Sequence, residues 1–370
     1  MAPNYTLEFV FLKKKLTMTQ AVDLTVVKKR QLTPSSVELT FSVPEEMKSN
    51  FAFNAGQYLT LIHEINNREI RRSYSLCSAP SQNAWRVGIK KVQDGVFSTW
   101  AHDQLNEGAT LKVLAPQGNF TITPHPEDQQ HYLAFAAGSG ITPIMGMIQQ
   151  TIAVAPLARF TLVYGNRSPE EAMFLEELSA LEQSHPEQFK LILFYSRTSQ
   201  QGARFGRIDA GPVKHLFQNE LAGIKFSQFL LCGPEQMIHT LKEILPQFGA
   251  APKHIHDELF FSNSGGDSQE NSTDVPQGHC ALTIVLDGET TVLNIDKNTA
   301  VLDAALDHDL DPPYSCQGGI CSSCIARVTE GQAQMIKNQI LTDGEVEEGL
   351  VLTCQTLAQS DQITVDYDEA

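Results

Sequence analysis

Hydrophobic and polar positions follow three different patterns along the chain. Between residues 21 and 122, short runs rich in Val, Leu, Ile and Thr recur between turn residues, without helical periodicity. Runs such as VDLTVVKKR, VELTFSV and QYLTLIHEI are typical of strands in an antiparallel barrel or sandwich. We therefore predict an all-β domain over residues 21–125, preceded by a poorly ordered extension over residues 1–20.

The pattern changes after Pro126. Apolar runs, HYLAFAAGSG, RFTLVYGNR, FKLILFYSR and FSQFLLCGP, then alternate with amphipathic segments. Strands that alternate with helices indicate a parallel sheet with helices on its faces, which we predict for residues 126–262. Helix starts are expected at Thr142-Pro143, at a capping box of Ser168, Pro169 and Glu171 that opens a helix through about Leu181, and near Pro234.

A polar segment rich in Gly and Ser, residues 263–279, is typical of a flexible linker. After it, ALTIVLDGETTVLNI predicts a hairpin around Asp287-Gly288, and TAVLDAALDHDL predicts a short helix that ends before Pro312 and Pro313. A third domain is therefore expected over residues 280–370.

Composition agrees with a modular globular protein. The length of 370 residues suits two or three domains, and 42% hydrophobic against 19% charged residues suits folded material. No run reaches the roughly 18 to 20 apolar residues of a membrane helix. The lysines at positions 13–15 follow the first apolar stretch, the reverse of a secretory signal, so we predict a cytoplasmic protein.

The net charge of −16 argues against binding to nucleic acid, because phosphates require clustered cations. Most of this charge lies in residues 280–370, where 16 acidic and 3 basic residues give −13 and leave −3 for the rest of the chain. The third domain is therefore a distinctly acidic module.

Four of the seven cysteines share one arrangement. Cys316, Cys321 and Cys324 form C-x4-C-x2-C in PYSCQGGICSSC, and Cys354 follows in VLTCQT. This spacing matches the ligands of a plant-type 2Fe-2S cluster, in which thiolates hold both irons. A zinc site or a disulfide pair is the alternative, although zinc sites usually pair C-x2-C units or include His. Residues 280–370 resemble plant-type ferredoxins, which implies an α+β β-grasp fold.

Two motifs of the first domain carry candidate chemistry. RRSYSL at 71–76 places an arginine and hydroxyl groups along a strand, where they could face the diphosphate and ring of a flavin. A solvated barrel face is the alternative. DGVFSTW at 94–100 places a glycine turn before a helix start, which is a potential anion site.

A further motif follows the first strand of the second domain. GSGITP at 138–143 departs from the dinucleotide pattern G-x-G-x-x-G, because Pro143 replaces the third glycine. It nevertheless places a glycine turn at a helix N-terminus, where backbone donors favour a phosphate. A packing turn is equally compatible with these residues taken alone.

Together these motifs resemble the ferredoxin-NADP reductase superfamily, whose flavin domain is an antiparallel six-stranded β-barrel with an R-x-Y-S motif. The resemblance implies that Arg72 binds the FAD phosphates, that Tyr74 and Ser75 lie at the isoalloxazine and ribityl groups, and that 95–98 binds the diphosphate. The FAD residues implied in this way are Arg72, Ser73, Tyr74, Ser75, Lys90, Gly95, Val96, Phe97, Ser98 and Phe260.

The same resemblance implies a pyridine nucleotide site at GSGITP and at CGP, residues 232–234. Ser196-Arg197 resembles the pair that holds the 2'-phosphate of NADPH, a group that suits a guanidinium, so we favour NADPH over NADH. Arg167 could assist or could be a solvated loop cation. The implied nucleotide residues are Gly138, Ser139, Gly140, Thr142, Asn166, Arg167, Ser196, Arg197, Cys232, Gly233 and Pro234.

HIHDELFF at 254–261 resembles fused oxygenase reductases, in which a Glu and a Phe close the nucleotide domain near the flavin. The resemblance implies that Phe260 neighbours the flavin, unless it belongs to the core. It also implies that Glu258, Ser75 and Cys232 lie beside the reacting atoms.

The order of the three domains resembles the reductase components of oxygenases, in particular phenylacetyl-CoA epoxidase reductases. This resemblance implies that NADPH gives a hydride to FAD and that single electrons pass through the 2Fe-2S cluster to a partner oxygenase or hydroxylase. The acidic module would dock on a basic patch of that partner, or its charges only keep it in solution. A different oxygenase or ferredoxin acceptor, or a redox-sensing regulatory role, is the alternative.

Overall fold

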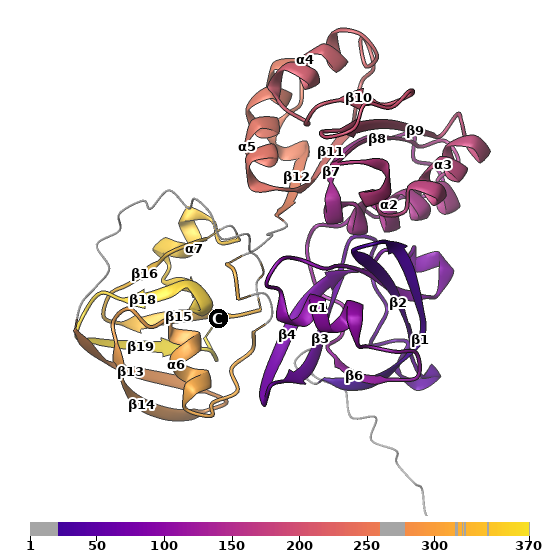
Figure 1. Cartoon of the computed structure of the whole chain (residues 1–370). Coiled ribbons are helices and arrows are strands. Elements are labelled where there is room, and N and C mark those ends of the chain that lie inside the picture. The colour runs from indigo at the N-terminus through magenta and orange to yellow at the C-terminus, as the bar shows by residue number, and fades with distance from the viewer. Residues whose placement is uncertain are drawn as a thin grey trace, which may run out of the picture.

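The computed structural model describes residues 21–259, 278–314, 317–319, 321, 323–338 and 340–369. The predicted N-terminal extension, most of the predicted linker, Phe260 and Cys316 lie outside these residues. Figure 1 shows three units, each with its own sheet. No helix within the described ranges is long and apolar enough to cross a membrane.

The first unit is a six-stranded antiparallel sheet with the strand order β4-β3-β6-β1-β2-β5. A bridge between Leu76, just after β4, and Val87 of β5 joins the two edges, so the sheet curls into a barrel. The inward side chains form an apolar core around Leu39 and Leu59. The elements are β1 (Val22–Thr33), β2 (Ser36–Ser42), β3 (Tyr58–Ile65), β4 (Arg68–Ser75), β5 (Trp85–Lys90), α1 (Val96–Asp103) and β6 (Thr110–Val113).

The second unit is a six-stranded parallel sheet in the order β10-β9-β8-β7-β11-β12. Helices α2 and α3 pack in one apolar cluster, and α4 and α5 pack in another, so both faces are covered (Figure 1). The elements are β7 (His131–Ala137), α2 (Ile141–Val154), β8 (Arg159–Asn166), α3 (Leu175–Ser184), β9 (Phe189–Tyr195), β10 (Arg204–Phe205), α4 (Ala210–Gln218), β11 (Gln228–Gly233), α5 (Glu235–Ile244) and β12 (Ile255–Leu259).

Two predicted helix starts are wrong. The Ser168 to Glu171 capping box opens only a short 3-10 turn, because Phe174 adopts the left-handed conformation and α3 begins after it. Thr142 is not an N-cap but lies in the first turn of α2, where its hydroxyl donates to the carbonyl of Ser139. The expected start near Pro234 is confirmed, because Pro234 caps α5.

The third unit is a five-stranded mixed sheet in the order β14-β13-β19-β15-β17, with α6 in its apolar core. The β13-β14 hairpin turns at Asp287 and Gly288 as predicted, and both have the positive φ that such turns require. The elements are β13 (His279–Leu286), β14 (Glu289–Asp296), α6 (Val301–Asp307), β15 (Ile325–Glu330), β16 (Ala333–Met335), α7 (Asp343–Glu347), β17 (Leu350–Leu352), β18 (Thr356–Ala358) and β19 (Gln362–Asp366).

Candidate functional site

The ends of β7 and β11 meet at the predicted nucleotide motifs. Gly138 has φ +55°, and the GSG residues form a 3-10 turn between β7 and α2. A Cβ on Gly140 would lie 2.2 Å from the carbonyl oxygen of Cys232, so only glycine allows this approach. The GSGITP and CGP motifs, whose first residues are 94 positions apart in the sequence, therefore meet at the carboxyl edge of the parallel sheet. Parallel sheets bind ligands at this edge.

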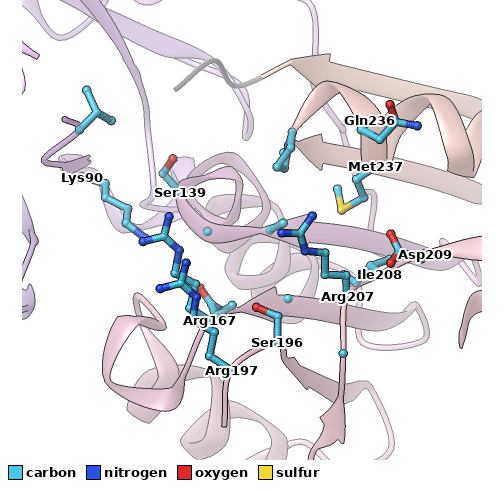
Figure 2. Close-up of a pocket in the computed structure, with 18 of the residues that line it drawn as sticks. Lys90, Ser139, Arg167, Ser196, Arg197, Arg207, Ile208, Asp209, Gln236 and Met237 are labelled. Atoms are coloured by element: carbon cyan, nitrogen blue, oxygen red, sulfur yellow. The ribbon is translucent and has the colours of Figure 1, made fainter. Parts of the chain in front are cut away.

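A pocket of about 680 Å³ opens at this edge. Figure 2 shows Lys90, Arg167 and Arg197 on one side of it and Arg207 beside Asp209 on the other. With Lys91, five cations line the pocket, and against Asp209 and the nearby Glu171 they leave an excess of positive charge that suits phosphates. Eight of the predicted residues line the pocket: Gly138, Ser139, Asn166, Arg167, Ser196, Arg197, Gly233 and Pro234.

The other three predicted nucleotide residues, Gly140, Thr142 and Cys232, are buried behind the pocket wall. Lys90, which the resemblance assigned to FAD, lines this pocket, and its Nζ lies 3.7 Å from the carboxylate of Glu171. Burial lowers the pKa of Lys90, and Glu171 opposes that shift. Lys90 therefore contributes its charge on the nucleotide side of the barrel.

Sequence reasoning missed Arg207, Asp209, Gln236 and Met237, which also line the pocket. Arg207 follows β10, a two-residue strand with no recognisable pattern of its own. No local pattern in the sequence therefore marks Arg207 as a pocket residue.

The R-x-Y-S strand and α1 contact each other through their aromatic residues. The ring of Tyr74 on β4 lies 5.8 Å from that of Phe97, and Phe97 lies 5.5 Å from Trp100. Trp100 in turn stacks on His63 of β3 at 3.8 Å. Burial raises the pKa of Tyr74, so its hydroxyl is a neutral donor.

The N-terminus of α1 has no side-chain cap, which leaves backbone donors of its first turn for an anion. Gly95 is required here, since a Cβ would lie 2.5 Å from the hydroxyl of Ser98. Phe97 and Ser98 are buried, and Ser98 donates to the carbonyl of Gly95, so these two side chains build the turn. The donor set fits a diphosphate through Val96 and the helix backbone.

Of the remaining R-x-Y-S residues, Ser75 is buried and Ser73 lies 3.3 Å from the hydroxyl of Thr60. Arg72 donates to the carbonyl of Arg71 and to the Oε1 of Gln317 at 3.3 Å. Gln317 belongs to the cluster loop of the third unit, so the flavin strand and that loop touch.

Glu258 and Cys232 are paired neighbours on β12 and β11. The Oε2 atom of Glu258 is covered and has no hydrogen-bond partner in the described part of the chain. Burial raises the pKa of Glu258 to about 8, and burial together with Glu258 raises the pKa of Cys232. Both side chains are therefore protonated at neutral pH, and Cys232 lies beside the GSG turn.

Three of the four predicted cluster ligands are described. Cys321, Cys324 and Cys354 are buried and form no disulfide within the described ranges, and Cys316 lies outside them. The backbone N-H and hydroxyl of Thr353 both donate to the carbonyl of Cys324 at 3.0 Å, which ties the loop to the Cys354 segment. Gln355 makes a second tie to the carbonyl of Gln317.

The QGG turn of this loop has a backbone conformation that favours glycine. Gln317 and Gly319 have φ of +55° and +71°, and a Cβ on Gly319 would lie 2.8 Å from the carbonyl oxygen of Lys337. The described part of the loop therefore packs closely against the segment of Lys337.

Family models match all three units. They are an oxidoreductase FAD-binding domain at residues 23–122, an oxidoreductase NAD-binding domain at 135–243 and a 2Fe-2S iron-sulfur cluster binding domain at 284–359. The chain is 35% identical to a subunit of 1,2-phenylacetyl-CoA epoxidase from Escherichia coli K12, over 95% of this chain and 99% of that protein. The chain belongs to the family of flavin and iron-sulfur reductase components of oxygenases.

Two further matches agree with this assignment. The reductase is 31% identical to the ferredoxin reductase component of 3-ketosteroid-9-alpha-monooxygenase from Rhodococcus rhodochrous, over 94% of this chain and 97% of that one. Phthalate dioxygenase reductase shares its fold, with a TM-score of 0.62 at 21% identity over 94% of this chain and 98% of that one. The predicted multidomain fold, FAD, pyridine nucleotide and 2Fe-2S cluster are confirmed.

Proposed function

We propose that this reductase takes hydride from NADPH and delivers single electrons to an oxygenase component of the phenylacetyl-CoA epoxidase kind. The choice of partner rests on the 35% identity to the epoxidase component over nearly the whole of both chains. The 31% identity to a steroid monooxygenase reductase makes that oxygenase the second candidate acceptor. When bound, FAD accepts a hydride and releases electrons singly, which a one-electron cluster requires.

The chain's own residues have distinct tasks in this proposal. The first turn of α1, Gly95 to Ser98, binds the FAD diphosphate with backbone donors, and Arg72 adds a charge. Tyr74 and Ser75 orient the flavin, which Phe260 covers, and Cys232 shapes the nicotinamide end of the pocket. Glu258 holds a proton at Oε2 and exchanges it with the reacting centre. Cys316 completes the cluster ligands with Cys321, Cys324 and Cys354.

Two properties of the third unit extend the proposal to its surroundings. Its excess of carboxylates favours docking on a basic patch of the oxygenase. We also propose a cytoplasmic location, because a reducing compartment keeps cluster thiols from forming disulfides.

Coenzyme choice is tested at Arg197, whose guanidinium we assign to the 2'-phosphate. Arg197→Ala should raise the KM for NADPH roughly tenfold or more and leave the KM for NADH unchanged, because charged hydrogen bonds contribute about 1.5–3 kcal/mol. Arg159→Ala, at the opposite edge of the sheet, is the matched control. An equal rise for both coenzymes would argue against a 2'-phosphate contact.

The partner is tested by comparing acceptors under anaerobic conditions. The NADPH-reduced protein is mixed with the oxygenase components of phenylacetyl-CoA epoxidase and of 3-ketosteroid-9-alpha-monooxygenase, and reoxidation of the cluster is followed. Faster reoxidation by the epoxidase supports the proposal. Faster reoxidation by the monooxygenase transfers the assignment to the second candidate.

A further inference from the structure

The cluster loop lies against the flavin strand through one cation. The guanidinium of Arg71 on β4 sits 4.3 Å from the ring centroid of Tyr314 and 3.1 Å from the carboxylate of Asp311. Glu69 fixes the same guanidinium from its own strand at 2.8 Å. Tyr314 and Asp311 shortly precede Cys316, the first cluster ligand in the chain.

Tyr314 and Asp311 together form a recognition site for a guanidinium. An aromatic face binds a cation through its quadrupole, and a carboxylate at its edge pairs with the N-H groups of the fork. Tyr314 is 5% exposed and packs against Leu302 and Leu352, so its ring is held rigidly. Asp311, in contrast, is 82% exposed even with Arg71 bound, so it remains open to a second protein.

The rest of this contact is polar and sparse. Gln317 accepts from Arg72, Ser323 donates to the Oε1 of Gln117 at 3.1 Å, and Lys337 lies 4.0 Å from Glu235 of the nucleotide unit. The apolar clusters of the third unit contain none of the residues of the other two units. Such a contact dissociates far more easily than a packed core, because water replaces its hydrogen bonds and screens its charges.

We propose that the Asp311–Tyr314 site binds Arg71 while the cluster accepts electrons, and binds a basic side chain of the oxygenase while the cluster delivers them. Arg71 is thus a positioning residue for internal transfer, and the acceptor offers an arginine in its place. This inference rests on the proposed function, because it requires a protein acceptor. A partner cation on this site would stand beside the cluster loop, where the distance for electron transfer is short.

The two halves of the cycle are separated in a stopped-flow instrument. In the first, the full-length protein is mixed with saturating NADPH and the cluster absorbance is followed. In the second, dithionite-reduced protein is mixed with cytochrome c, a basic protein used as the probe acceptor. Iron per chain and flavin bleaching are measured for every variant, so loss of a cofactor is recognised separately.

Arg71→Gln should slow cluster reduction about three- to tenfold and leave delivery to cytochrome c unchanged or faster, because the site is vacated. Asp311→Asn should slow both halves to a similar degree, and Tyr314→Leu should do the same. Tyr314→Phe, which keeps the aromatic face, should restore both rates. The double variant that exchanges the two charges, Arg71→Asp with Asp311→Arg, should restore the rate of cluster reduction by NADPH but not the rate of delivery to cytochrome c.

Asp311→Asn that slows neither half, or Arg71→Gln that slows both equally, would overturn the shared site. Asp311 is exposed, so its variant keeps the test valid if Tyr314→Leu does not fold. A wild-type protein whose cluster NADPH never reduces would instead refute the proposed function itself.

Discussion

The nucleotide unit meets the barrel through a shared apolar core, whereas the ferredoxin unit meets it through a few polar side chains. The core cluster of α2 and α3 includes Ala55, Cys77, Phe120 and Ile122 of the flavin domain. The second contact has Arg71 and its neighbours, with no shared core among the described residues. We call the contact between the barrel and the nucleotide unit the first joint, and the contact between the barrel and the ferredoxin unit the second joint. The first joint is built to stay closed and the second to open.

Backbone packing reinforces the first joint. A Cβ on Gly146 of α2 would lie 2.9 Å and 3.0 Å from the carbonyl oxygens of Ser78 and Leu76. A buried carboxylate reinforces it further. Glu38, 3% exposed, pairs with Arg30 and Arg86, and these reach Glu177 of α3 and Gln149 of α2 respectively.

The difference matches the two kinds of transfer. A hydride moves only when donor and acceptor atoms are held in contact, so the nucleotide and flavin sites need a fixed relative position. A single electron tolerates a looser geometry, and the cluster must in addition reach an external acceptor. The chain therefore fixes one joint with apolar packing and holds the other with charges.

The largest effect is expected from removing a cluster ligand. Cys324→Ala should abolish cytochrome c reduction while ferricyanide, which takes electrons from the flavin, is still reduced by NADPH. Cys280→Ala removes another buried thiol and is the control. Loss of both activities in Cys324→Ala would mean that the first joint depends on the ferredoxin unit.

A smaller effect is expected from weakening the buried network of the first joint. Glu38→Gln leaves Arg86 without a carboxylate and Arg30 with that of Glu177 alone, and it should cost about 3 kcal/mol, which lowers the thermal midpoint by roughly 6–12 °C. Calorimetry of the full chain measures this shift of the midpoint. Asp311→Asn is the comparison at the second joint, and a midpoint shift as large as that of Glu38→Gln would contradict the distinction.

A further effect, which depends on pH, concerns Glu258. Because burial raises its pKa to about 8 in the folded protein, the folded state holds this proton more tightly than the unfolded state. Its contribution to the free energy of unfolding is complete below about pH 4.5 and is lost as the pH rises to 8.

Denaturant titrations from pH 5 to 9 measure this contribution. The free energy of unfolding of the wild type, relative to that of Glu258→Gln, should fall over this range and level off above pH 8. Asp257→Asn, beside it on β12 and paired with Lys242, is the control. A constant difference between wild type and Glu258→Gln would show that the carboxyl is not protonated in the folded protein.

Local patterns predicted most of the fold. The C-x4-C-x2-C spacing, Gly95, the hairpin at Asp287-Gly288 and the helix after Pro234 each depend on neighbouring residues, so the sequence reveals them. The helix start at Leu175 was missed because the capping signal at Ser168 is locally complete, and tertiary packing places Phe174 in the left-handed region.

The residues that join the units could not be predicted in this way. Arg71 and Asp311 are 240 positions apart, and nothing near either of them indicates the contact. In the sequence, Glu38 resembles any polar strand residue, and only the folded protein shows that Arg30 and Arg86 pair with it. Each of these depends on how whole units pack.

The distinction between the two joints is tested most directly by one anaerobic stopped-flow experiment on the wild-type protein at saturating NADPH, at low and at high ionic strength. Salt screens the Arg71 contact and does not weaken apolar packing. Flavin bleaching should keep its rate while cluster bleaching slows severalfold. An equal slowing of both, or a cluster rate that does not respond to salt, would contradict the distinction between a fixed joint and an ionic one.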